Sequence, residues 1–116
     1  MEYLPLTQVA RAFSTHDFEA VIERMSVTLT WDLVGGRTYT GKEEVVAACR
    51  ESADYLSDIT STFESVRIVD GGSTVVVDTR ASYTEDDGSV SRVASCDIYD
   101  FEGELLTKIT SYTVEL

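Results

Sequence analysis

The stretch CDIYDFEGELL, residues 96–106, predicts two strands joined by a tight turn at Glu102-Gly103. Side chains alternate between the two faces of a strand, so Asp97 shares a face with Tyr99 and Phe101. A carboxylate on an aromatic face is costly to bury unless it is solvated, paired or protonated. Asp97 is therefore the residue of this hairpin best suited to carry chemistry.

The second half of the chain has the pattern of a meander. β-Branched and aromatic residues alternate with polar ones, and Gly-containing turns separate the runs. Long neighbouring strands joined by tight turns pair antiparallel. The predicted strands cover residues 59–69, 74–84, 90–101 and 105–114.

The first half predicts three helices and one strand. Apolar residues recur at helical spacing over residues 4–13 and 18–25, and again from Gly41 to Leu56. Thr40 and Glu43 have the spacing of a capping box at the start of the third helix. Period-two alternation between residues 26 and 34 predicts a strand. The order helix, helix, strand, helix and then four strands predicts an α+β fold, in which a curved antiparallel sheet wraps around helices to form a cone-shaped pocket.

Length and composition narrow the functional classes. A chain of 116 residues suits one domain with one core, covering residues 1–116. Nine Lys and Arg against 21 Asp and Glu give a net charge of −12, which opposes binding to nucleic acid or to anionic membranes. The sequence shows neither a spanning apolar run nor a signal segment, so we expect a cytoplasmic location. Cys49, Cys96 and His16 match no standard ligand spacing, so we expect no metal site, and both cysteines are interpreted as small buried residues.

At this point the chain resembles the nuclear-transport-factor-2-like superfamily and, within it, the SnoaL-like and ketosteroid-isomerase-like proteins. The order and spacing of several short motifs carry the resemblance over nearly the whole chain. These motifs are Thr15-His16-Asp17-Phe18-Glu19, Val27 to Asp32, Gly41-Lys42-Glu43-Glu44-Val45-Val46, and Asp100-Phe101-Glu102-Gly103-Glu104-Leu105. The resemblance implies a cystatin-like α+β barrel, with helices packed inside a curved sheet.

The resemblance also implies two catalytic carboxyl groups. Ketosteroid isomerases place a general-base Asp in an Asp-x-Val-Gly stretch, which corresponds here to Asp32-Leu33-Val34-Gly35. They place a second, protonated Asp six residues before the hairpin Gly, as Asp97 stands before Gly103. Those enzymes also use a tyrosine from the first helix, where this chain has Val9, so steroid isomerisation does not follow from the resemblance.

Each candidate has a structural alternative. Asp32 shares its strand face with Thr28 and Thr30, which suits either a polar-lined pocket or a strand-end Asp held by backbone N–H groups. Asp97 could instead form a salt bridge to Arg80 or Arg92. His16 precedes a predicted helix, and we expect it to be exposed or to act as a cap.

Aromatic residues on the elements expected to line the cone are candidate ligand contacts. They are Phe13, Trp31, Tyr55, Phe63, Tyr99 and Tyr112. We expect a small hydrophobic or amphipathic ligand and a homodimer formed through the sheet, with Trp31 and the Val/Thr-rich strand faces as the second surface to bury. The leading hypothesis is an acid/base enzyme without a cofactor, of isomerase, cyclase or hydratase type, acting on a small cyclic or polyketide-like carbonyl compound. The alternative is a non-catalytic ligand-binding or dimeric interaction module on the same fold.

Overall fold

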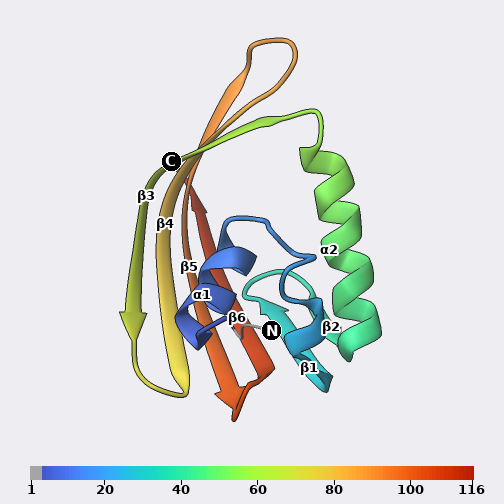
Figure 1. Cartoon of the computed structure of the whole chain (residues 1–116). Coiled ribbons are helices and arrows are strands. Elements are labelled where there is room, and N and C mark those ends of the chain that lie inside the picture. The colour runs from blue at the N-terminus through green and yellow to red at the C-terminus, as the bar shows by residue number, and fades with distance from the viewer. Residues whose placement is uncertain (1–3) are drawn as a thin grey trace.

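The computed structural model describes residues 4–116, and Figure 1 shows helices packed against a curved sheet. The elements follow one another as α1 (Leu6–Ser14), the 3₁₀ turn η1 (Ile22–Arg24), β1 (Met25–Leu33), β2 (Thr38–Thr40), α2 (Lys42–Leu56), β3 (Thr60–Asp70), β4 (Thr74–Thr84), β5 (Val90–Glu102) and β6 (Leu105–Glu115). The α+β class and the run of four late strands are confirmed. Within these residues, no helix is long and apolar enough to cross a membrane.

The sheet is mixed rather than wholly antiparallel. Its strand order is β2-β1-β6-β5-β4-β3, and β3 to β6 form the predicted antiparallel meander. β1 pairs in parallel with β6, because the chain crosses from one sheet edge to the other through α2 before the meander begins. This crossover closes the sheet around the helices and brings the first strand beside the last.

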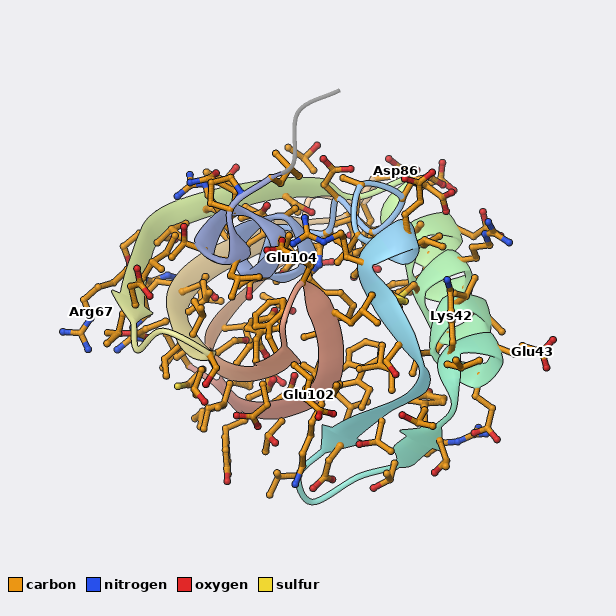
Figure 2. All side chains as sticks on the ribbon, turned by 60° about the horizontal axis from the view of Figure 1, so that its bottom comes forward. Lys42, Glu43, Arg67, Asp86, Glu102 and Glu104 are labelled. Atoms are coloured by element: carbon orange, nitrogen blue, oxygen red, sulfur yellow. The ribbon has the colours of Figure 1, made fainter. Side chains whose placement is uncertain are left out.

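The sheet bends around α1, and side chains extend into the space inside the bend (Figure 2). In the same view the labelled Arg67 and Glu43 point away from the body of the molecule. One apolar cluster joins α1, α2 and the concave face of the sheet. Its members include Val9, Phe13, Leu29, Val45, Cys49, Val75, Val77, Tyr99 and Ile109. Both helices therefore cover the same face of the sheet.

The predicted second helix over residues 18–25 is wrong. The structure has turns followed by the short η1, and Met25 already belongs to β1. Phe18, Val21 and Met25 are buried as expected, but turns and a 3₁₀ segment produce the same burial at intervals of three to four residues. Periodicity alone does not separate these two structures.

The expected capping box is also absent. Gly41, not Thr40, is the N-cap of α2, with a φ of 93° that suits glycine, and it has no side-chain cap. The Thr40 backbone N–H donates to the Glu44 carboxylate at 3.1 Å, one residue later than predicted. The shift follows from Thr40 belonging to the short strand β2, which pairs with β1.

Arg24 ties the start of β1 to the turn between β5 and β6. Its guanidinium donates to the Leu4 and Glu104 carbonyl oxygens at 2.8 Å each and pairs with the Glu104 carboxylate at 2.7 Å. The Arg24 side chain is only 8% exposed, whereas that of Glu104 is 59% exposed. The two backbone bonds are therefore the protected part of this contact.

We predict that Arg24→Ala lowers the free energy of unfolding by about 2–4 kcal/mol, because two charge-assisted hydrogen bonds are lost and their carbonyl acceptors lose their donors. Glu104→Gln is the matched control and is expected to cost less than about 1 kcal/mol, since its carboxylate is exposed. Urea unfolding of the two variants checks this. Equal losses in both variants would mean that the ion pair, not the backbone bonds, carries the contact.

Candidate functional site

A cavity of about 560 Å³ opens between the two helices and the concave face of the sheet. Its apolar lining comes from α1, β1 and α2, and its polar lining comes mainly from β4, β5 and β6. Residues on this wall include Phe13, Trp31, Tyr55, Thr79, Asp97 and Ser111. This volume is in the usual range for small-molecule sites.

Asp97 lies on this wall, is only 9% exposed and is held by hydroxyl groups. Ser14, at the end of α1, donates to Asp97 Oδ2 at 2.8 Å. The Tyr99 hydroxyl lies 3.4 Å from the same oxygen and 2.5 Å from Ser14 Oγ. The strand alternation predicted from the sequence explains why Tyr99 and Asp97 share this face.

Burial raises the pKa of the Asp97 carboxyl, and hydrogen bonds from Ser111, Ser14 and Tyr99 oppose that rise. Burial and the nearby Asp97 charge raise the pKa of Tyr99 well above its usual value, so its hydroxyl keeps its proton. Within residues 4–116, the ion pairs of Arg80 and Arg92 are made to Asp78 and Glu64, so the alternative of a salt bridge to Asp97 is wrong. The site thus has a buried carboxyl group surrounded by neutral donors.

Ser111 connects this carboxyl group to the aromatic wall. It pairs with Asp97 across the β5–β6 ladder, and its Oγ accepts a hydrogen bond from Trp31 Nε1 at 3.0 Å. The Phe13 ring packs edge-on against both Trp31 and Tyr99, at centroid distances of 5.0 and 5.8 Å. These contacts hold the carboxyl group and its aromatic surroundings in one arrangement.

His16 lines the same cavity, contrary to the expected exposed or capping role. Its Nε2 lies 2.9 Å from the Tyr83 hydroxyl, and its ring lies beside those of Phe18 and Phe63. Burial lowers the pKa of His16, which favours the neutral imidazole. Within the described residues, its buried Nδ1 has no hydrogen-bond partner. No local sequence pattern indicates this placement, because His16 and Tyr83 are 67 residues apart and meet only in the tertiary structure.

Asp32 does not join this group. Its neighbours Trp31 and Leu33 line the cavity, so the Asp32 side chain points to the outer face of the sheet. There it accepts a hydrogen bond from Thr38 at 3.1 Å. The expected pairing of Asp32 with Asp97 in one pocket is therefore not formed within this chain, because Trp31 rather than Asp32 takes the inward position.

The six aromatic candidates fall in three places. Phe13, Trp31 and Tyr55 line the cavity. Tyr99 is buried behind the wall, and Phe63 packs against His16. Tyr112 alternates with the cavity residues Ser111 and Thr113, so it lies on the outer face and is 46% exposed, against expectation.

No group of three or more His, Cys, Asp or Glu side chains in residues 4–116 is placed to hold a metal ion.

The raised pKa of Asp97 predicts a particular pH dependence of stability. The folded chain binds this proton more tightly than the unfolded chain, so the contribution of Asp97 to stability falls as pH rises through its folded pKa. We expect Asp97→Asn to be more stable than the wild type at pH 7, with the difference shrinking toward pH 4. Thermal unfolding across this range checks it. A variant less stable by about 3 kcal/mol or more at pH 7 would instead indicate a buried ion pair.

Comparison with known proteins agrees with this architecture. A family model described as a SnoaL-like domain matches residues 6–109. An NTF2-like protein of unknown function from Cytophaga hutchinsonii is 26% identical, with a TM-score of 0.82 and coverage of 92% of this chain and 94% of that chain. A search of the curated proteins finds no match.

Two further solved structures share the fold at lower identity. An LEH-like epoxide hydrolase from M. tuberculosis is 15% identical, with a TM-score of 0.71 and coverage of 93% of this chain and 81% of that chain. A candidate polyketide cyclase from Xanthomonas campestris pv. campestris is also 15% identical, with a TM-score of 0.70 and coverage of 90% and 83%. The predicted resemblance is confirmed, and because the family model spans most of the sequence, the chain belongs to the SnoaL-like family.

Proposed function

We propose that this protein is an acid/base enzyme without a cofactor, acting on a small, mostly apolar carbonyl compound. The observation that carries the proposal is the buried Asp97 carboxyl group on the wall of an aromatic-lined cavity. A carboxyl group with a raised pKa both accepts and donates a proton more readily near neutral pH than an exposed one. Proteins named as an epoxide hydrolase and a candidate polyketide cyclase share this fold, which supports an enzymatic role for the cavity.

Asp97 is proposed to act alone as both base and acid. Its carboxylate removes a proton from the carbon next to the substrate carbonyl, and the C–H electron pair moves to form the enolate. The protonated Asp97 then returns the same proton to carbon at the original or a conjugated position. Ser14 and Tyr99 hold one carboxyl oxygen, so they orient the other oxygen for proton transfer. Asp32 has no part in this scheme, because its side chain lies on the outer face of the sheet.

The chemical proposal is tested by deuterium exchange of 2-tetralone, a bicyclic ketone with acidic α-hydrogens, followed by NMR in D₂O. The wild type is expected to accelerate exchange over buffer. Asp97→Asn is expected to reduce that acceleration by about 100-fold or more, in line with the usual contribution of a general base. Asp32→Asn makes the same chemical change on the opposite face of the sheet. Its deuterium exchange rate is expected to stay within twofold of the wild-type rate.

An unchanged exchange rate in Asp97→Asn would contradict the role of Asp97. If the wild type binds 2-tetralone without accelerating exchange, the non-catalytic binding module is the better description of this chain.

We also propose a homodimer formed through the outer face of the sheet. Both helices cover the concave face, and Val69, Tyr112 and Val114 are exposed on the other side. Exposed apolar patches of this kind suit association with a second copy. Trp31, expected in this interface, is instead buried in the core, so it is not part of the proposed surface.

Light scattering coupled to size exclusion tests the dimer. The wild type is expected to have twice the chain mass of 12.8 kDa at micromolar concentration. Val114→Glu places a charge on the proposed surface, where Val114 is 60% exposed, and is expected to give a monomer. Val27→Glu is the control and keeps the dimer, because Val27 is 81% exposed near the start of β1, at the Leu106 end of β6 and away from Val114. This interface is wrong if the wild type is a monomer, or if both variants lose the dimer to the same extent.

A further inference from the structure

We infer that His16 and Tyr83 form a second polar subsite of the cavity, which binds a hydroxyl group of the substrate at a distance from Asp97. This inference deepens the proposed function and rests on it for the assignment of the carbonyl end to Asp97. The substrate class it specifies is a planar cyclic ketone that carries a hydroxyl group remote from its carbonyl.

The first observation is the backbone position of His16. Helix α1 ends in a Schellman motif, in which the Asp17 N–H donates to the Ala12 carbonyl at 2.8 Å and the His16 N–H donates to the Phe13 carbonyl at 3.1 Å. In this motif the residue at the His16 position has a left-handed backbone, and the φ of His16 is 71°. Glycine suits this position best, and His is among the few other residues often found there. The helix end therefore fixes the backbone at His16 and, with it, the place of the ring in the cavity wall.

The second observation is the unused hydrogen-bonding capacity of the pair. If the neutral imidazole carries its hydrogen on Nε2, it donates to the Tyr83 oxygen, and the Tyr83 O–H remains available as a donor. If the hydrogen is on Nδ1, Tyr83 donates to Nε2, and a lone pair of the Tyr83 oxygen remains available as an acceptor. Nδ1 itself is enclosed by the protein, so the Tyr83 hydroxyl is the group that a ligand can reach. A hydroxyl group can donate and accept, so it satisfies either form. A purely apolar ligand satisfies neither.

The third observation is the separation of this pair from Asp97 within one cavity. Asp97 is opposite Val77 in the β4–β5 ladder, whereas Tyr83 is opposite Ser91, six residues farther along β4. All of these groups except Val77 line the cavity, so the two polar centres are separate points on the wall of one binding space. Burial, and then the Asp97 charge, raise the pKa of Tyr83, so its hydroxyl keeps its proton as a donor.

The surroundings of the pair specify the shape of the ligand. Phe18 and Phe63 flank the His16 ring at centroid distances of 5.6 and 5.4 Å, and Phe13 stands against Phe18 at 5.2 Å. Flat aromatic walls favour a flat ring that stacks or packs edge-on against them. The ligand that this subsite specifies is therefore a flat fused ring system with an oxygen for each of the two polar centres.

The test compares two probes that differ by one hydroxyl group, 1-tetralone and 6-hydroxy-1-tetralone. Dissociation constants are measured by NMR titration of the wild type, and the ratio of the two constants isolates the contribution of the hydroxyl group. We expect the wild type to bind the hydroxylated probe about three- to tenfold more tightly, the usual effect of one hydrogen bond. In Tyr83→Phe, which removes a single oxygen, the ratio is expected to fall to about one, with the affinity for 1-tetralone unchanged.

Two more variants complete the experiment. His16→Asn replaces the ring with a side chain that also tolerates the left-handed backbone. This variant is expected to reduce the ratio, because a change in affinity common to both probes cancels in the ratio. Asp97→Asn is expected to leave the ratio at its wild-type value, because it keeps both members of the His16–Tyr83 pair. Three results would each overturn the subsite. The first is a wild-type ratio of one. The others are a Tyr83→Phe variant that keeps the wild-type ratio and an Asp97→Asn variant whose ratio falls to one.

The ratio of the two dissociation constants tests the subsite, and the rate of deuterium exchange tests the proposed enzymatic function. Either result can contradict one proposal without the other. If the wild type does not catalyse deuterium exchange but keeps a hydroxyl preference that depends on Tyr83, the proposed enzymatic function is wrong and the subsite stands. If the wild type catalyses exchange but shows no preference for the hydroxylated probe, the enzymatic function stands and the subsite is wrong.

Discussion

The concave face of the sheet is the constraint on which the rest of this structure depends. Six strands curve, two helices cover only the inner side, and strict alternation decides which residues enter the enclosed space. Asp97, Tyr99 and Ser111 point inward because of their register in β5 and β6. A shift of one residue in either strand would exchange the polar wall for outward-facing neighbours such as Cys96 and Tyr112.

The polar groups of the cavity are held mainly by neutral partners. Ser14 at the end of α1 joins the helix to Asp97 on β5, so one hydrogen bond both docks the helix and orients the carboxyl group. At the next turn of the chain, His16 meets Tyr83 on β4. The last turn of α1 and the residues just after it therefore connect to two separate points on the sheet. This arrangement links the stability of the helix end to the geometry of both polar centres.

Much of the fold was predictable from the sequence because its signals are local. Glycine turns and period-two alternation located four strands, and helical spacing located α1 and α2. The second helix was wrong because consecutive turns bury Phe18, Val21 and Met25 as a helix does. The parallel pairing of β1 with β6 joins residues about 80 positions apart, as in Trp31 with Ile109, and no local pattern reports it. The short β2 was missed for a different reason: its pairing with β1 is local, but its three residues are too few to show an alternating pattern.

The sequence by itself determined the α+β class, the meander and the inward face shared by Asp97 and Tyr99, since these depend on alternation and turn chemistry along a few residues. Only the tertiary structure decided which groups meet. It turned Asp32 outward with its strand register, surrounded Asp97 with Ser14 and Ser111 rather than with the arginine of the alternative interpretation, and brought His16 to Tyr83. These contacts depend on sheet curvature and on the helix end packed inside it. Neither feature is a property of any short stretch of sequence.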